Sequence, residues 1–176
     1  MPDSLAVLFV CTANICRSPT MELLARDLAG GARIYFGSAG THARDGEPMN
    51  PDMVATLPAH VDSSEFRSQH LEAALLTEAD LVLTATSVHR QFVLDDFPQH
   101  HRKLFTLGQF AETIGQIPDL RGRELVTAAG TRRAPAAPGH DVADPYRRGQ
   151  AAAERARGTI TAMLSDIVPR LTARES

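Results

Sequence analysis

An unbroken run of six apolar residues at positions 5–10, ending directly at Cys11, is the strongest constraint on the fold. Strands covered on both faces, as in a parallel sheet, have this continuous apolar character. A helical pattern follows from Ser18, with Pro19 suited to a first helical turn, and it stops at Gly30. The start of the chain therefore predicts a buried strand, a tight turn and a helix.

The rest of the chain alternates apolar runs with helical patterns. We expect further strands at 33–36, 80–84 and 103–107, and helices at 51–57, 69–76, 88–94 and 152–171. Stretches rich in Gly and Pro predict loops at 37–51 and 128–145, and 121–138 looks like a long connection. This alternation predicts one α/β domain over residues 1–176, with a four-stranded parallel sheet and a ligand site beyond the carboxyl ends of its strands.

Composition excludes several classes of protein. The 18 basic and 21 acidic residues give a net charge of −3, so we expect no nucleic-acid partner. No apolar stretch approaches the roughly 20 residues of a membrane span, and the N-terminus lacks the features of a signal peptide. Two cysteines, Cys11 and Cys16, cannot form a disulfide framework, and the seven histidines have no metal-ligand spacing. We expect a cytoplasmic protein; the pattern carries no indication of its oligomeric state.

The turn after the first strand combines a cysteine, an arginine and a serine. It reads Cys11-Thr12-Ala13-Asn14-Ile15-Cys16-Arg17-Ser18. The N–H groups of a tight loop, the positive end of a helix and a guanidinium can surround a tetrahedral oxyanion. The same field favours a thiolate at Cys11, which the Ser18 hydroxyl could hydrogen-bond. The alternative is that Cys11 is a small buried residue and Arg17 a surface charge.

Residues 7–19, Val-Leu-Phe-Val-Cys-Thr-Ala-Asn-Ile-Cys-Arg-Ser-Pro, resemble the signature of low-molecular-weight protein tyrosine phosphatases. Matching features recur at 38–41, 79–83 and 144–146. The resemblance implies a flavodoxin-like three-layer sandwich, with helices on both faces of the four-stranded parallel sheet. It also implies hydrolysis of phosphate monoesters, above all phosphotyrosine in protein substrates, through a phosphocysteine and without a metal or cofactor.

The resemblance also assigns roles to residues. Cys11 is the expected nucleophile, Arg17 and the loop residues hold the phosphate, and Asp144 is the expected general acid. The phosphate-binding residues are Thr12, Ala13, Asn14, Ile15, Cys16 and Ser18. An acid is needed because an alkoxide or phenoxide leaves slowly unless its oxygen is protonated. Asp141 competes for this role but lacks the following proline that restricts the backbone of Asp144.

The substrate cleft departs from the family pattern, in which the loop at 41–48 usually supplies an aromatic wall. That loop has no Phe, Tyr or Trp, which leaves His42 on one side of the expected cleft and Tyr146 on the other. Ile15 matches tyrosine-type members, whereas relatives that act on phosphoarginine carry threonine there. A protein arginine phosphatase, an arsenate-reductase-like enzyme and a phosphate-binding module with little turnover remain alternatives. The sequence has no cysteine after Cys16, so it offers no downstream thiol for an electron relay. Oxidation could pair Cys16 with Cys11.

Overall fold

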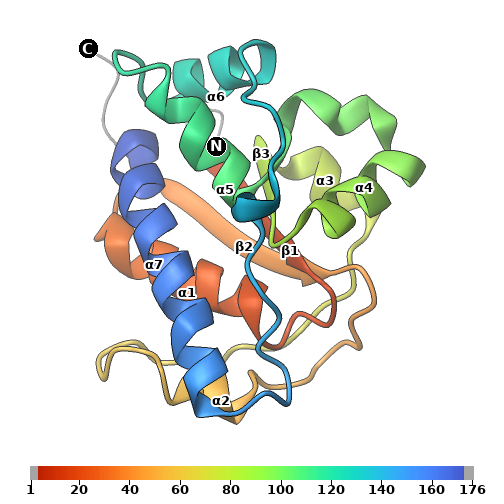
Figure 1. Cartoon of the computed structure of the whole chain (residues 1–176), viewed down its shortest axis with the longest axis vertical. Coiled ribbons are helices and arrows are strands. Elements are labelled where there is room, and N and C mark those ends of the chain that lie inside the picture. Colours follow the sequence, from red (N-terminus) through yellow and green to blue (C-terminus); the bar gives the residue numbers. More distant parts are fainter. Residues whose placement is uncertain (1–3, 173–176) are drawn as a thin grey trace.

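A computed structural model describes residues 4–172, and a parallel sheet forms its centre (Figure 1). The strands are β1 (Leu5–Cys11), β2 (Ile34–Gly40), β3 (Leu81–Thr84) and β4 (Leu104–Thr106). They pair in the order β2-β1-β3-β4, and every pairing is parallel. The predicted four-stranded parallel sheet is therefore confirmed.

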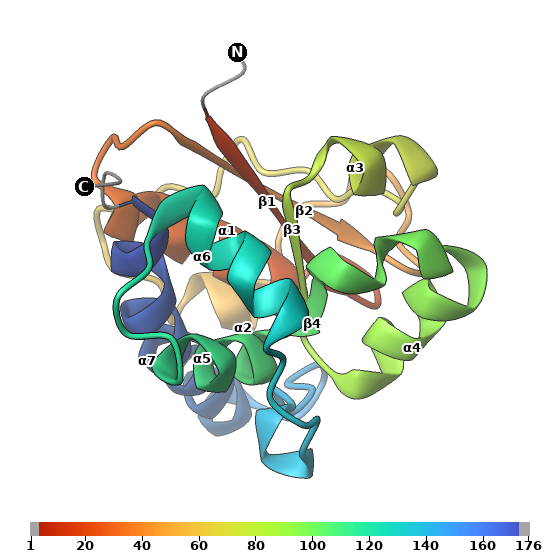
Figure 2. The ribbon, with the colours of Figure 1, turned by 90° about the horizontal axis from the view of Figure 1, so that it is seen from above.

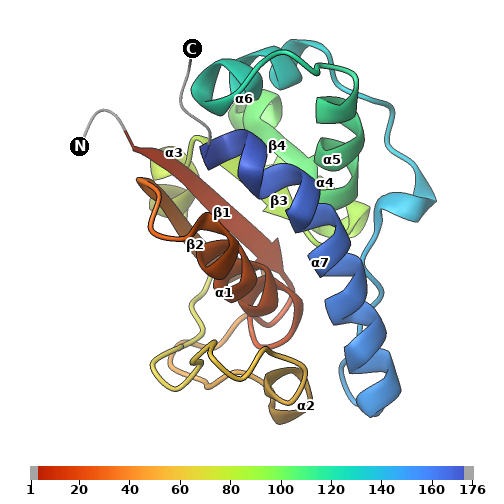
Figure 3. The same ribbon diagram turned by 90° about the vertical axis from the view of Figure 1, so that its left-hand side faces the viewer.

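Helices cover both faces of the sheet. They are α1 (Arg17–Ala29), α2 (Pro51–Val54), α3 (Ala73–Glu78), α4 (Ser87–Asp96), α5 (Leu107–Gly115), α6 (Gly122–Thr131) and α7 (Gln150–Thr172). Two short 3-10 turns, Pro98–Lys103 and Pro138–His140, complete the regular structure. Figure 2 shows α1, α5 and α7 on one side of the sheet and α3 and α4 on the other. In Figure 3, α1 and α7 lie in front of the sheet.

The central strand β1 explains the unbroken apolar run. Successive side chains of a strand point to opposite faces. Val7 and Phe9 pack into the core with α1 and α7, whereas Leu8 and Val10 pack into a second core that includes residues of α3 and α4. Because both faces are buried, β1 has no polar alternation, and it delivers Cys11 to the carboxyl end of the sheet.

Several element boundaries differ from the sequence predictions. Strand β2 continues through residues 37–40, which were expected to be a loop, because these small residues pair with β1 as far as Gly40 opposite Cys11. Helix α6 occupies much of the expected connection at 121–138 and the start of the expected loop at 128–145. It forms there because Leu125 and Ala129, one helical turn apart, are both buried.

The other differences concern helices. Helix α2 stops at Val54, helix α3 starts only at Ala73, and helix α5 was not predicted at all. Helix α5 follows directly on β4, so a single apolar run hides the change from strand to helix at Leu107. Within residues 4–172, no helix is long and apolar enough to cross a membrane.

Four loops meet at the carboxyl end of the sheet. The turn between β1 and α1 lies beside the end of β2, because Thr41 N donates to Cys11 O over 2.9 Å. The segment between the 3-10 turn Pro138–His140 and α7 bonds to the turn after β3 through Val142 N and Ala85 O, 2.8 Å apart. This is the edge at which the sequence predicted a ligand site.

Candidate active site

In the turn between Cys11 and Arg17, here called the phosphate loop, three carbonyl groups are bonded to backbone outside the loop. Cys11 O and Thr12 O accept hydrogen bonds from the backbone of the β2 end, and Ile15 O accepts one from Asn50 N over 2.8 Å. Peptide groups whose carbonyls face outward present their N–H groups inward. Together with the N-terminus of α1 at Arg17, this arrangement suits an anion.

Asn14 fixes the shape of the phosphate loop. Its backbone has φ +54°, in the left-handed region that asparagine tolerates better than most residues. Its buried side chain donates to Ser18 Oγ (2.7 Å) and Ser38 Oγ (2.9 Å) and accepts from Gln69 N (2.9 Å). One amide therefore ties the loop to α1, to β2 and to the segment before α3.

The bonds of Asn14 also orient the serine beside the cysteine. Ser18 Oγ lies 3.0 Å from Cys11 Sγ, and because it accepts from Asn14, its own proton is available for the sulfur. The competing acceptor, Ala39 O, is farther away at 3.4 Å. The Ser18 hydroxyl is thus placed to stabilise a thiolate at Cys11.

Ser38 extends the polar network away from the site. It accepts from Asn14, and its hydroxyl donates to Glu22 Oε2 over 2.5 Å. Burial raises the pKa of Glu22, while Ser38 and Arg26 act in the opposite direction. Arg26 forms an ion pair with the same carboxyl group, at 2.5 Å.

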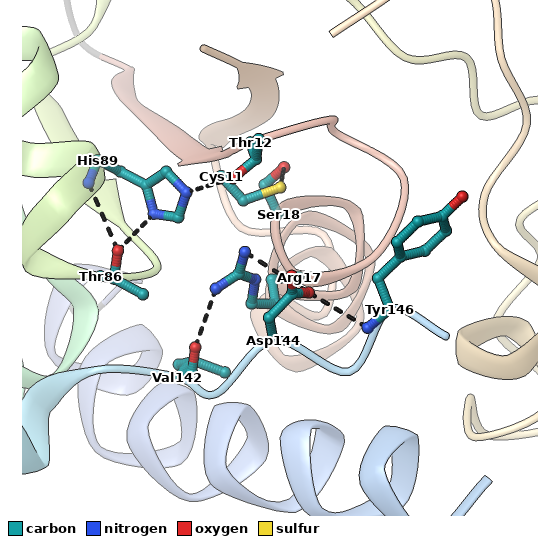
Figure 4. Close-up of polar contacts among 9 residues, drawn as sticks. All are labelled: Cys11, Thr12, Arg17, Ser18, Thr86, His89, Val142, Asp144 and Tyr146. Carbon is teal, nitrogen blue, oxygen red and sulfur yellow. Dashed lines mark hydrogen bonds and ion pairs between the residues drawn. The ribbon is translucent and has the colours of Figure 1, made fainter. Parts of the chain in front are cut away.

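Arg17 is buried beside the loop with part of its guanidinium uncommitted. Its Nη1 donates to Val142 O over 3.1 Å, and its Nη2 lies 3.7 Å from Asp144 Oδ1 (Figure 4). Among the described residues its buried Nε has no hydrogen-bond partner. A buried donor without a partner is costly, and an oxyanion in the phosphate loop would satisfy it.

The two candidate acids occupy different positions. Asp144 Oδ1 faces Arg17, accepts a bond from Tyr146 N over 3.2 Å, and belongs to a half-exposed side chain. The Asp141 carboxylate instead accepts hydrogen bonds from Ser87 N (2.8 Å) and Ser87 Oγ (3.2 Å), at the start of α4. The structure therefore brings Asp144 to the phosphate loop and uses Asp141 to attach its segment to α4.

The expected cleft residues are both exposed, on opposite segments. The His42 ring contacts the Phe92 ring, with 5.2 Å between centroids, so α4 backs the side where the loop lacks an aromatic residue. The guanidinium carbon of Arg147 lies over the Tyr146 ring, 5.1 Å from the ring centroid. Ile15 is partly buried against the main core.

Cys16 is the residue before α1, and its side chain is buried. Burial, reinforced by the nearby Cys11, raises the pKa of the Cys16 thiol to about 12. Cys16 therefore stays protonated near neutral pH and is a poor nucleophile. Cys11 and Cys16 are both free cysteines.

Sequence reasoning missed the residues that support the loop from outside it, namely Ser38, Gln69 and His89. His89 bonds to Thr12 and Thr86, as Figure 4 shows. The available signal was the spacing Thr86-x-x-His89. A threonine directly before a helix accepts a hydrogen bond from the N–H group of the third helical residue, so this spacing indicates a helix that starts after Thr86. In residues 4–172, no three His, Cys, Asp or Glu side chains gather in a way that could hold a metal ion.

Fold and loop together define a class, the α/β phosphatases that carry a cysteine and an arginine in a phosphate-binding turn after the first strand. Residues 6–120 match the model of the low molecular weight phosphotyrosine protein phosphatase family, and the chain belongs to this family.

Three relatives illustrate the range of the family. The probable low molecular weight protein-tyrosine-phosphatase EpsP of Ralstonia nicotianae is 30% identical over 168 residues, covering 95% of this chain and 96% of the relative. A protein-arginine-phosphatase of Bacillus subtilis is 34% identical over 129 residues, covering 72% of this chain and 86% of that protein. The crystal structure of the low molecular weight protein tyrosine phosphatase from T. tengcongensis is 27% identical, with a TM-score of 0.74 over 95% of this chain and 99% of that chain.

Proposed function

We propose that this protein hydrolyses phosphate monoesters, with phosphotyrosine in proteins as the substrate, through a phosphocysteine at Cys11. The observation that carries the proposal is the convergence of three groups on one loop. Ser18 contacts Cys11 Sγ at 3.0 Å, Arg17 has an uncommitted buried Nε, and Asp144 lies 3.7 Å from Arg17. A nucleophile, an anion-binding group and an acid thus come from different elements to one place.

In the first step, the Cys11 thiolate attacks phosphorus and the bond from phosphorus to the ester oxygen breaks. Arg17 and the loop N–H groups hold the nonbridging oxygens, whose charge they stabilise through the transition state. Protonated Asp144 gives its proton to the leaving oxygen, so a phenol departs instead of a phenoxide. The Ser18 hydroxyl, 3.0 Å from the sulfur, donates a hydrogen bond that stabilises the attacking thiolate.

In the second step, water attacks the phosphocysteine and the bond from sulfur to phosphorus breaks. Asp144, now a carboxylate, takes the proton of the attacking water. The electron pair of the broken bond returns to Cys11, where the Ser18 hydroxyl again stabilises the thiolate. Inorganic phosphate leaves, and Asp144 is protonated and ready for the next substrate.

Phosphotyrosine is favoured by Ile15 in the phosphate loop and by Tyr146, which follows Asp144 and Pro145 in the chain. Ile15 offers an apolar branched side chain, and the exposed Tyr146 ring offers an aromatic face. Stacked or edge-on aromatic pairs contribute about 0.5–1.5 kcal/mol beyond the burial of area, which favours a phenyl ring over an alkyl chain. We place the enzyme in the reducing cytoplasm, where Cys11 remains a free thiol that can act as nucleophile.

The proposal is tested by comparing phosphotyrosine, phosphoarginine and arsenate at equal concentration. We expect the highest kcat/KM for phosphotyrosine and no turnover in the Cys11→Ser variant. Faster hydrolysis of phosphoarginine would make the protein an arginine phosphatase, like its relative from Bacillus subtilis. Tight phosphate binding without turnover of any substrate would show that the loop serves binding alone.

A further inference from the structure

His89 is a buried titratable residue beside the phosphate loop that the proposed reaction does not use. It lies in the first turn of α4 with 6% of its surface exposed. Its Nε2 is 2.7 Å from Thr12 Oγ1, and its Nδ1 is 2.8 Å from Thr86 Oγ1. Both ring nitrogens are therefore engaged by hydroxyl groups, one of which belongs to the residue after Cys11.

The surroundings of His89 keep the imidazole neutral. Burial, followed by the positive charge of Arg17, lowers the pKa of His89 to about 4. Asp144 and Asp141 act in the opposite direction, and His42 adds a small further lowering. A neutral imidazole has one donor nitrogen and one acceptor nitrogen, so the ring links the two threonines in a directed chain of hydrogen bonds.

Thr12 is held from two directions. Its carbonyl oxygen accepts from His42 N over 2.8 Å, which anchors its backbone beyond the end of β2. Its hydroxyl is hydrogen-bonded to His89 Nε2 in the first turn of α4. Since Thr12 directly follows Cys11, its position determines how the first part of the loop is placed around a phosphoryl group.

The turn that carries His89 also holds the segment of the acid. Val142 N donates to Ala85 O over 2.8 Å, and Asp141 accepts two hydrogen bonds from Ser87. Residues 85–89 therefore contact the nucleophile side of the site and the acid side at once. His89 provides the contact to the nucleophile side.

We propose that His89 is a positioning residue, which through Thr12 fixes the phosphate loop relative to the segment that carries Asp144. The inference rests on the proposed function, because it names the residue that holds the phosphate loop and the Asp144 segment of the same site in their relative positions. His89 does not touch the reacting atoms, so its effect passes through the hydroxyl of Thr12.

Two substitutions separate the bonds of His89. Glutamine places its terminal atoms about as far along the side chain as Nε2, whereas asparagine reaches about as far as Nδ1. We expect His89→Gln to keep the contact to Thr12 and to stay within about threefold of the wild-type kcat/KM for an aryl phosphate. His89→Asn should lose between about tenfold and a hundredfold, the range that a small misplacement of reacting groups costs.

A double-mutant cycle tests whether the effect of His89 passes through the Thr12 hydroxyl. Thr12→Val, which removes the hydroxyl of an exposed residue at nearly constant shape, should match His89→Asn, and the double variant should lose no more than the worse single one. Thr12→Ser, which keeps a hydroxyl group for His89, should lose less activity than Thr12→Val. Val88→Ala is the matched control, because Val88 is 74% exposed in the same helical turn.

Equal losses for glutamine and asparagine, or losses that multiply in the double variant, would overturn the proposal. If the wild type turns over no substrate, the proposed function fails, and the same variants are compared by their affinity for inorganic phosphate. Weaker binding by His89→Asn than by His89→Gln then supports the positioning role, and equal binding refutes it. Thermal unfolding of each variant separates loss of fold from loss of position.

Discussion

Replacing Gly40 with alanine tests how rigidly the end of β2 supports the phosphate loop. Gly40 lies opposite Cys11 in the sheet. A Cβ at this position would lie 2.5 Å from Thr12 O, 2.8 Å from Ala43 Cβ and 2.9 Å from Asn14 N. Two of these neighbours are backbone atoms of the loop, so no side-chain rotation relieves the contact and the loop itself must move.

The size of that movement follows from ordinary contact distances. A carbon and a carbonyl oxygen approach to about 3.3 Å, so Thr12 must retreat by about 0.8 Å. Overpacking of this kind costs about 1–3 kcal/mol in the free energy of unfolding. Because a misplacement of about 1 Å at reacting groups can cost a hundredfold in rate, kcat/KM for an aryl phosphate should fall by up to about that factor.

The assay compares Gly40→Ala with Gly37→Ala in the same strand. A Cβ at Gly37 would meet the ring of Tyr35 at 3.3 Å, and that side chain is 63% exposed and free to turn aside. We expect the Gly37 variant to keep wild-type kcat/KM and phosphate affinity. If the Gly40 variant matches it in activity, affinity and unfolding free energy, the loop is not held by β2 in the way described.

Three further predictions concern the polar groups of the site. The neutral, buried His89 has a pKa of about 4 against about 6.5 when unfolded, so it stabilises the fold fully above pH 6.5. That contribution, up to about 3 kcal/mol, is lost as the pH falls from 6.5 toward 4, and denaturant unfolding should show a shallower loss for His89→Gln. Asn14→Ala removes three hydrogen bonds, two buried and one partly buried, and should lower the unfolding free energy by about 3 kcal/mol, measured in the same way. Mild peroxide should oxidise Cys11 to a sulfenic acid, and condensation with the Cys16 thiol, slow because that thiol is mostly protonated, should form a disulfide and release water. Mass spectrometry of the digested protein should find this disulfide, which a thiol reductant reverses, and its absence would refute the predicted pairing of Cys11 with Cys16.

The sequence was sufficient where one local pattern decides the structure. Strand β1 is apolar on both faces, and a cysteine placed directly after it can only lie at the carboxyl end of the sheet. The proline after Asp144 likewise separated it from Asp141, and the structure places Asp144, not Asp141, beside Arg17.

The sequence was insufficient where tertiary contacts override local preference. Glycines at 37 and 40 indicate a loop, yet β2 continues through them because they pair with β1 as far as Cys11. Position 40 is glycine because the phosphate loop leaves no space for a larger side chain there. Helix α5 was hidden because its first residue, Leu107, completes the apolar run of β4. The spacing Thr86-x-x-His89 indicated a helix start, but nothing local indicated the contact of His89 with Thr12, which is 77 residues away in the chain.

The proposed reaction depends most directly on a covalent intermediate at Cys11. The decisive measurement mixes the wild-type protein rapidly with an aryl phosphate and locates the phosphoryl group by mass spectrometry at early times. We predict that it is found on Cys11, that Cys11→Ser releases no phenol, and that Asp144→Asn slows formation of the adduct most for poor leaving groups. A phosphoryl group on another residue, release of phenol by Cys11→Ser, or a larger leaving-group effect in Asp141→Asn would contradict it.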